Sequence, residues 1–332
     1  MPDLYDVAAI GNAIVDVIAP ADDAFLAANK LDKGAMMLVD AEASSALYGK
    51  MAPGLETSGG SAANTIAGLA SLGGRGAFLG KVANDQLGQV FAHDLAAIGA
   101  HYANAPLEQG PATAVSMINV TPDGQRTMCT YLGASVQFTD EDVDPAVIEG
   151  ARIVYLEGYL FDRDEAKEAF KAAARLAQKS GAKVALTLSD AFCVDRHRAD
   201  FLKFIREGTD ILFANEKEIT SLYEVNSFAE AADAALADCE LAVLTRSGEG
   251  SVIVADGETI AVAPEPVRAV VDVTGAGDLY ASGFLYGLTQ GAPLATCGRL
   301  GSLAAAEVIG HIGARPEASL RKLAQERGLL GE

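Results

Sequence analysis

The sequence predicts an α/β fold with three layers, α/β/α, in which helices cover both faces of a mostly parallel central sheet. Beyond residue 150, short apolar runs alternate with segments of helical periodicity, which is typical of repeated strand–helix units. Several runs are apolar without interruption, as expected for parallel strands buried on both faces. Alternating polarity at about 14–40 and 112–135 predicts a second, small sheet that acts as a lid. We expect one domain over 1–332, with this lid sheet inserted into it.

The first half of the chain supplies the start of the central sheet and the lid. Asp16 interrupts an otherwise apolar strand, and a lone carboxylate there is costly unless it is paired or faces a ligand. The alternative is a solvent-facing residue on an edge strand. A Gly-Gly turn at Gly59 opens an Ala-rich helix that runs to Ala70. The other expected elements are strands at 7–10, 14–18, about 31–40 and 77–82, a helix at 85–98, and a hairpin over 112–130 that turns at 121–124.

The second half consists of strand–helix units followed by helices. We expect strands at 153–156, 184–188, 211–214, 241–244 and 251–254, and helices at 163–180, 197–207 and 228–236. A further apolar run, Val267–Val273, predicts a strand that leads through a turn into a buried helix at 279–286.

Composition excludes several classes of partner. The formal net charge is -20 and the pI is about 4.5, so the surface repels a phosphate backbone or an anionic membrane. We therefore expect no nucleic-acid or membrane partner. Neither the four cysteines nor the four histidines show metal-ligand spacing. No signal peptide or long apolar span is found in the sequence, which predicts a soluble, cytoplasmic protein.

The stretch Asp272–Asp278 is a strand-to-helix turn that contains two glycines and ends in an acid. Backbone N–H groups at a helix start are unpaired and carry partial positive charge, so Gly275, Ala276 and Gly277 are expected to receive an anion. Asp278 places a carboxylate beside that anion. This is costly at a simple binding loop, but a base that takes a proton from an attacking hydroxyl must lie there. The alternative is that Asp278 only stabilises the helix start.

Two more polar stretches follow predicted strands. They comprise Asn215 and Glu218, after the strand at 211–214, and Thr245, Gly248 and Gly250, after the strand at 241–244. Ligands of open α/β sheets bind outside the carboxyl ends of strands, so these stretches and the glycine turn predict one extended anionic ligand. Glu218 is a candidate to hold Mg²⁺, directly or through water. A helix-capping pair between Asn215 and Glu218 is an equal alternative.

The start of the Ala-rich helix is a candidate ligand site as well. Its small residues allow close approach, and Asn64 lies one helical turn after Gly60 on the same side. A tightly packed helix with a polar cap explains the same pattern. Walker A, dinucleotide, zinc-protease and nucleophile-elbow motifs are all missing from the sequence, which disfavours those enzyme classes.

Together these stretches resemble the ribokinase-like (PfkB) family of carbohydrate and nucleoside kinases. Gly59–Asn64 is similar to the family's N-terminal signature, Asp272–Asp278 to its C-terminal signature, and Asn215–Glu218 to its Asn-x-x-Glu element. They occur in the family's order over essentially the whole chain. The resemblance implies a ribokinase-like domain with a β-sheet lid and transfer of a phosphoryl group from ATP to an alcohol.

The resemblance also implies roles for individual residues. Asp278 is the general base, and the backbone of Gly275, Ala276 and Gly277 forms the anion hole. Residues expected at the acceptor are Asn12, Asp16, Gly60 and Asn64, with Arg126 closing from the lid onto a phosphate unless it is a surface arginine. Residues expected along ATP are Asn215, Thr245, Gly248 and Gly250, with Glu218 supporting Mg²⁺. A monovalent cation such as K⁺, found in some members, would lie among Asp272, Thr274 and the backbone at Val308, His311 and Gly313. Glu317 stands where some of those members carry a small hydroxyl residue.

Smaller features narrow the acceptor. Gly11–Asp16 and the stretch 123–134 are similar to adenosine kinases, and Ser61 stands where ribokinases typically carry lysine. We therefore expect a kinase that phosphorylates the 5′-hydroxyl of adenosine or a related nucleoside, working as a monomer or homodimer on a small molecule. Candidates to contact the base are Met36, Met37, Phe138 and Tyr159. The alternatives are a sugar kinase for ribose, fructose or a similar sugar, and a non-catalytic nucleotide-binding regulator.

Overall fold

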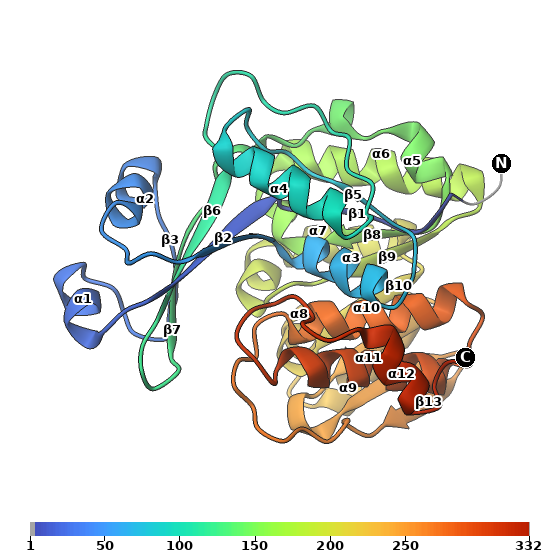
Figure 1. Ribbon diagram of the computed structural model, residues 1–332. Coiled ribbons are helices and arrows are strands. Elements are labelled where there is room, and N and C mark those ends of the chain that lie inside the picture. Colours follow the sequence, from blue (N-terminus) through green and yellow to red (C-terminus); the bar gives the residue numbers. More distant parts are fainter. Residues whose placement is uncertain (1–3, 332) are drawn as a thin grey trace.

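A computed structural model describes residues 4–331 of the chain. Its larger sheet has eight strands in the order β13-β12-β11-β10-β9-β8-β1-β5 (Figure 1). All neighbours from β11 to β5 run parallel, and the hairpin β12–β13 adds an antiparallel edge. The expected α/β fold class is confirmed. The strands are β1 (Tyr5–Ile10), β5 (Gly76–Leu79), β8 (Ala151–Glu157), β9 (Lys183–Thr187), β10 (Ile211–Asn215), β11 (Leu241–Thr245), β12 (Ser251–Ala255) and β13 (Glu258–Val262).

Helices cover both faces of this sheet, and each face has its own hydrophobic cluster. Successive residues of a strand point to opposite faces, so Val7 and Ala9 of β1 pack in one cluster while Ala8 and Ile10 pack in the other. Helices on the first face are α3 (Ser61–Ser71), α4 (Gln86–Ala97), α10 (Ala276–Thr289), α11 (Leu294–Val308) and α12 (Leu320–Glu326). Those on the second are α5 (Pro145–Glu149), α6 (Asp164–Ser180), α7 (Ala191–Gly208), α8 (Glu216–Tyr223) and α9 (Phe228–Asp238).

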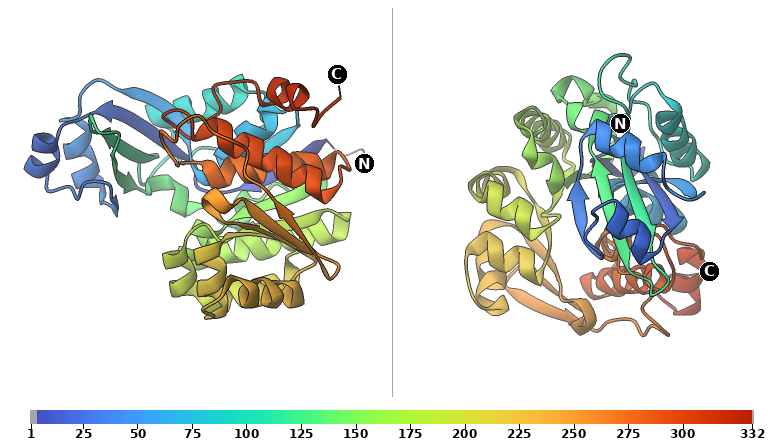
Figure 2. Two further views of the ribbon diagram at one scale, coloured as in Figure 1. Left: turned by 90° about the horizontal axis from the view of Figure 1, so that it is seen from below. Right: turned by 90° about the vertical axis from the view of Figure 1, so that its left-hand side faces the viewer.

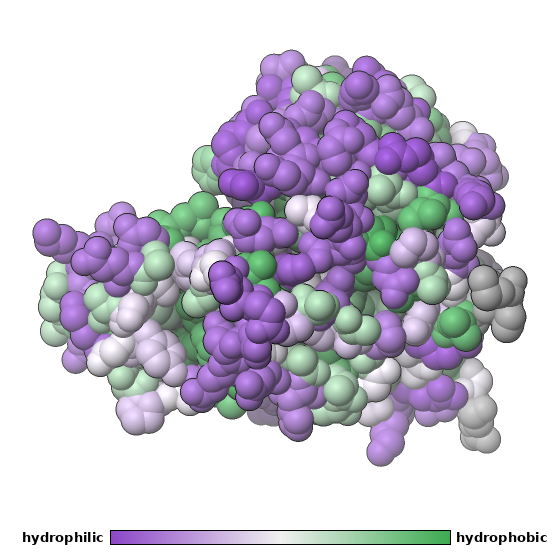
Figure 3. All heavy atoms as spheres, turned by 90° about the horizontal axis from the view of Figure 1, so that it is seen from above, coloured by the Kyte–Doolittle hydropathy of each residue, from purple (hydrophilic) through white to green (hydrophobic). Residues whose placement is uncertain are grey.

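The smaller sheet projects from the body as an arm, in the order β3-β7-β6-β2-β4 (Figures 1 and 2). It carries two short helices, α1 (Asp23–Ala28) and α2 (Ala41–Tyr48). Its strands are β2 (Ile14–Pro20), β3 (Met36–Leu38), β4 (Leu55–Gly59), β6 (Ala114–Val120) and β7 (Arg126–Tyr131). In the view of Figure 3 the surface is largely hydrophilic, and hydrophobic residues gather where the arm meets the body. Among the described residues, none of the helices combines the length and the apolar character needed to cross a membrane.

The chain passes between the two sheets at positions that shape the space between them. It leaves β1 at Ile10 and enters β2 at Ile14, and it leaves β4 at Gly59 and enters α3 at Ser61. Gly60, between β4 and α3, has φ +91, and a Cβ there would collide with the carbonyl oxygen of Asn12. Only glycine tolerates both the positive φ and this close approach to Asn12. The chain segments that cross between the sheets at Asn12 and at Gly60 therefore lie in direct contact.

The prediction of a strand at 267–273 is wrong. Residues 267–273 form an irregular segment, in which Val270, Val271 and Val273 are 59%, 45% and 67% exposed. The large sheet ends instead at β13, which was not anticipated. The N–H groups of Val271 and Asp272 donate to the carbonyl of Ile309 at the end of α11, at 2.8 and 3.4 Å. Hydrophobicity indicated a strand here, but no partner strand lies beside the segment among residues 4–331.

Candidate active site

A cavity of about 370 Å³ lies at the carboxyl ends of the parallel strands, beneath the arm. It brings together residues that are far apart in the sequence. Predicted site residues that line it are Asp16, Gly60, Asn64, Asn215, Glu218, Thr245, Thr274, Gly275, Ala276, Gly277 and Asp278. The position agrees with the general rule that open α/β sheets bind ligands outside the carboxyl ends of their strands.

The arm contributes one face of alternating residues to the cavity. Asp16, Ser116 and Thr130 stand side by side on β2, β6 and β7, and the hydroxyls of Ser116 and Thr130 lie 2.9 Å apart. Two residues further along the strands, Ile118 and Met128 are paired in the same way. All five line the cavity. The face therefore presents a polar row followed by an apolar row, because side chains alternate with period two along a strand.

Asp16 is the charged member of the polar row. Burial raises the pKa of Asp16 to about 6, while Arg315 and Arg126 act in the opposite direction. Behind it lies Gly59, where any Cβ would collide with the Asp16 carboxylate. The glycine of the N-terminal signature thus makes room for the acid.

The glycine turn forms the opposite side of the cavity. Gly275 is the N-cap of α10 with φ +77, and a Cβ there would lie 2.7 Å from Cβ of Ala314. Gly277 faces open space, since a Cβ added there would meet no heavy atom of the described residues within 4 Å. The N–H of Ala276 donates to the carbonyl of Val273 at 3.2 Å. The helix start is therefore open to an anion mainly along its glycines.

Asp278 lies in the first turn of α10, facing α3. Its Oδ1 accepts a hydrogen bond from Ser61 Oγ at 2.6 Å, and its Oδ2 accepts one from Asn64 Nδ2 at 3.0 Å. The other end of the Asn64 amide, Oδ1, accepts from Nε of Arg315 at 3.0 Å. Burial raises the pKa of Asp278, and the bonds from Ser61 and Asn64 and the charge of Arg315 oppose that rise. The carboxylate is thus fixed in direction while one acceptor position on each oxygen stays available.

Arg126 reaches from β7 to the start of the glycine turn. Its Nη1 lies 2.7 Å from Asp272 Oδ2 and donates to Thr274 Oγ1 at 2.9 Å. The side chains of Arg126 and Asp272 are only 8% and 4% exposed. Nε and Nη2 of Arg126 are buried without a hydrogen-bond partner in the described structure. Arg126 is therefore a buried link between the arm and the turn, and not a surface arginine.

The end of β10 carries the predicted pair Asn215 and Glu218. Asn215 Oδ1 accepts from the N–H of Glu218 at 3.0 Å, and the Glu218 carboxylate accepts from the backbone N–H of Asn215 at 2.9 Å and from its Nδ2. This is a capping box, the structural alternative for these residues. Glu218 also lines the cavity, and burial raises its pKa to about 7. Each carboxylate oxygen accepts one of these bonds and has a second lone pair, which a water bound to Mg²⁺ could use.

Several predicted residues do not line the cavity. They are Asn12, Gly248, Gly250, Asp272, Val308, His311, Gly313 and Arg126. Asn12 is buried and donates from its backbone N–H and Nδ2 to Glu157 Oε1, at 3.3 and 2.9 Å. Its side chain is therefore turned into the protein. Of the four candidates for a base contact, Tyr159 alone lines the cavity among the described residues; Phe138 is fully buried in the core behind the sheet.

Two charged residues near the site, one buried and one partly buried, were not predicted from the sequence. Glu157, at the end of β8, accepts from Asn12 and from the N–H of Ala62 at 2.9 Å, and burial raises its pKa to about 7. Arg315 holds the Asn64 amide and lies close enough to Asp16 to affect its pKa. A lone acid ending an apolar strand was a usable signal for Glu157. For Arg315 the only signal was its place next to the predicted cation loop.

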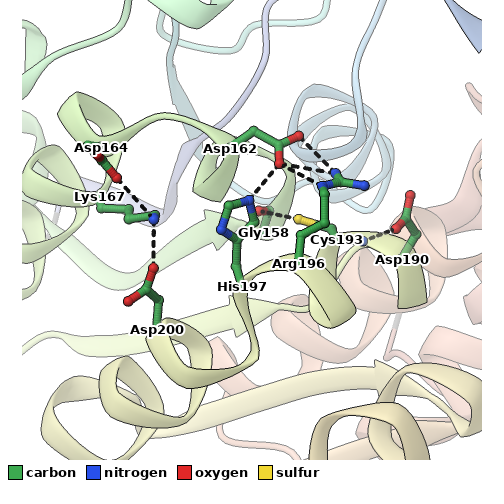
Figure 4. Close-up of polar contacts among 9 residues, drawn as sticks. All are labelled: Gly158, Asp162, Asp164, Lys167, Asp190, Cys193, Arg196, His197 and Asp200. Atoms are coloured by element: carbon green, nitrogen blue, oxygen red, sulfur yellow. Dashed lines mark hydrogen bonds and ion pairs between the residues drawn. The ribbon is translucent and has the colours of Figure 1, made fainter.

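A cluster of charged side chains supports the wall that carries Tyr159. Tyr159 belongs to the short 3₁₀ segment Gly158–Asp162. Asp162 accepts from Arg196 Nε and Nη2 at 3.0–3.1 Å and lies 2.7 Å from His197 Nε2 (Figure 4). Helix α7 is kinked at His197, where φ is -125 and ψ is 21. The kink lets consecutive residues of α7 hold one carboxylate, which fixes the segment against the helix.

The fold and this site together define a kinase of the ribokinase-like class. Residues 42–320 match the model of the pfkB family of carbohydrate kinases, and the chain belongs to that family. A solved structure named as an adenosine kinase from Sinorhizobium meliloti is 52% identical, covers 98% of this chain and 99% of that one, and superposes with a TM-score of 0.91.

Two other relatives are named for sugars. A probable sugar kinase from Rhizobium etli is 51% identical over 99% of this chain and 100% of that one, with a TM-score of 0.92. A 5-dehydro-2-deoxygluconokinase from Halalkalibacterium halodurans is 25% identical over 261 residues, which are 76% of this chain and 79% of that protein. The relatives therefore agree on kinase activity and differ in acceptor.

Proposed function

We propose that this kinase transfers a phosphoryl group from ATP to the 5′-hydroxyl of adenosine or a related nucleoside, giving AMP and ADP. The observation that carries the proposal is the two-row face of the arm. A nucleoside needs polar contacts for its ribose hydroxyls and an apolar surface for its flat base. Asp16 with Ser116 and Thr130 supplies the first, and Ile118 with Met128 supplies the second. The adenosine kinase from Sinorhizobium meliloti supports the same acceptor.

In this proposal Asp278 accepts the proton of the attacking hydroxyl. Ser61 and Asn64 hold its two oxygens in place, so the free lone pairs point into the cavity. Proton transfer to a positioned carboxylate contributes about 10²–10⁴-fold in rate. Phosphoryl transfer otherwise depends on in-line positioning and charge neutralisation. The glycines of the turn are the groups that meet the transferred phosphoryl group, and Arg126 adds positive charge from its buried position beside the turn.

ATP would lie along the ends of β10 and β11, at Asn215 and Thr245. These residues are paired neighbours in the sheet and both line the cavity. Mg²⁺, held through water by Glu218, would neutralise the phosphates when bound. Gly248 and Gly250 follow Thr245 in the turn before β12, where the backbone of Gly250 has φ +86. Their part in nucleotide binding is to shape that turn.

The test is ADP production by the purified enzyme with adenosine, inosine, ribose, fructose and 5-dehydro-2-deoxygluconate as acceptors. We expect turnover with a nucleoside and none with adenosine lacking its 5′-hydroxyl, which should instead compete with adenosine. In Met128→Ser, the KM for the nucleoside should rise while kcat changes little, because the base loses apolar contact. Turnover of a free sugar with no turnover of any nucleoside would reverse the assignment.

The second candidate is a sugar kinase, favoured by the names of the Rhizobium etli and Halalkalibacterium halodurans relatives. The same assay separates the two, since a sugar needs only the polar row. A non-catalytic regulator is a third alternative. It is disfavoured because Asp278 and the open glycine turn are both present in the cavity. A protein that binds ATP but consumes none with any acceptor would support it.

A further inference from the structure

We infer that Arg126 takes the place of a monovalent cation at Asp272, so that this kinase neutralises its anion-binding turn with its own guanidinium. The inference deepens the proposed function and rests on it only for the activity measurement. The resemblance placed K⁺ among Asp272, Thr274 and nearby backbone carbonyls. The described residues do not fit such an ion.

The side-chain oxygens of Asp272 and Thr274, two residues of the expected site, already share one donor. Nη1 of Arg126 lies 2.7 Å from Asp272 Oδ2 and 2.9 Å from Thr274 Oγ1. A cation bound between these oxygens would occupy the position of that nitrogen. Since both side chains of the Arg126–Asp272 pair are almost fully buried, the guanidinium cannot be displaced into water without leaving a buried charge unpaired.

Two further acceptor positions of Asp272 are also filled by donors. Oδ1 accepts from the N–H of Thr274 at 3.0 Å, and Oδ2 accepts from the N–H of Gly313 at 3.0 Å. A metal ion needs oxygen lone pairs, and here N–H groups point at both oxygens. Three donors with one full positive charge satisfy the carboxylate without an ion.

Of the remaining groups of the expected site, Gly313 presents its N–H to Asp272, and the others have partners of their own or are exposed. The carbonyl of Val308 faces the N–H of His311 at 3.5 Å. Glu317, which replaces a small hydroxyl residue, is 72% exposed and lies 3.7 Å from Nδ1 of His311.

The presence of an arginine side chain in place of an ion links neutralisation of the turn to the arm. A diffusible ion would neutralise Asp272 wherever the arm stood, whereas Arg126 is part of β7 and moves with the arm. Arg126, Met128 and Thr130 alternate along one strand face, so the residue that meets the turn and the residues that meet the acceptor move together. Neutralisation of the turn by Arg126 is therefore tied to the arm position that the structure shows.

The first test compares the wild-type enzyme in K⁺, Na⁺ and tetramethylammonium chloride at equal ionic strength. We expect rates within about twofold of one another. The melting temperature without substrate should also be equal in the three salts, and this measurement does not depend on the acceptor. A K⁺-specific rise in melting temperature, or a rate at least about tenfold higher in K⁺ alone, would overturn the inference.

The second test uses Arg126→Ala, with Lys33→Ala as the matched control. Lys33 pairs with Asp123 and Asp23 near the tip of the same hairpin and makes no contact with Asp272. Without substrate, we expect Arg126→Ala to melt lower in tetramethylammonium and to regain stability in K⁺ or guanidinium, because Asp272 is then open to an external cation. An Arg126→Ala protein as stable and active as Lys33→Ala in every salt contradicts the inference. If Arg126→Ala does not fold, the wild-type comparison alone decides.

Discussion

The hydrogen bond from Ser61 to Asp278 controls how readily that carboxylate is ionised. Burial raises the pKa of Asp278, and the 2.6 Å bond from Ser61 Oγ opposes the rise by stabilising the charged form. Ser61→Ala removes this opposition, so the pKa of Asp278 rises further. A hydrogen bond to a charged group is worth about 1.5–3 kcal/mol. At about 1.4 kcal/mol per pH unit, the pKa should move up by about 1–2 units.

The measurement is kcat against pH from about pH 5 to 9, by a coupled assay of ADP release. We expect the acid limb of the Ser61→Ala profile to move to higher pH by about 1–2 units. Well above that limb the rate should approach the wild-type plateau, because Asp278 is again ionised. The matched control is Thr65→Val, which removes a buried hydroxyl from the same helix. That hydroxyl donates to the carbonyl of Ser61 at 3.2 Å and does not contact Asp278.

An unchanged acid limb in Ser61→Ala would refute this reasoning, provided that the variant melts like the wild type. It would mean that the ionisation of Asp278 does not govern the rate. An equal shift in Thr65→Val would also refute it, because the effect would then come from loosening of α3 and not from the lost bond.

Three further changes test other parts of the site. Asp278→Asn should lower kcat by about 10²–10⁴-fold, while ATP still raises the melting temperature. Burial raises the pKa of Glu157 from 4.5 to about 7, so its contribution to stability is full at low pH and is lost as pH rises through 7. The free energy of unfolding of Glu157→Gln, measured in urea at pH 5 and pH 8, should therefore increase relative to that of the wild type as pH rises. Gly60→Ala should cost about 1–3 kcal/mol in the same unfolding assay, because φ is +91 and the new Cβ would strike Asn12; unchanged stability would contradict this.

The sequence predicted the large sheet well because its strands are short apolar runs buried on both faces. The hairpin β6–β7 followed from alternation and a clear turn signal. Strand β4, Leu55–Gly59, was missed because it contains one apolar side chain that is 64% exposed. The segment 267–273 was predicted as a strand for the opposite reason, since its valines are apolar but exposed. Pairing with a neighbour decides both cases, and pairing is not visible in a local pattern.

The site was predictable where its chemistry is local. The glycine turn and the Asn215–Glu218 pair each lie within one strand-to-helix junction, so spacing alone revealed them. Glu157 forms a hydrogen bond with Asn12, 145 positions away, and Arg315 forms one with Asn64, 251 positions away. No spacing rule covers such distances. Both asparagine side chains are held by these distant partners, while Asn64 also lines the cavity; no local pattern connects either residue to its partner.

The two carboxylates of the glycine turn differ in a way that supports the proposal of Asp278, and not Asp272, as the base. Asp272 receives an ion pair from Arg126 and bonds from two backbone N–H groups, and unlike Asp278 it does not line the cavity. At Asp278 the Asn64 amide stands between the carboxylate and the guanidinium: Arg315 donates to the amide oxygen, and the amide nitrogen donates to Asp278. An arginine in direct contact would lower its pKa by about 1–3 units and weaken it as a proton acceptor. Placing an amide between Arg315 and Asp278 orients the carboxylate while leaving it basic, so the proposed mechanism separates charge neutralisation at Asp272 from proton transfer at Asp278.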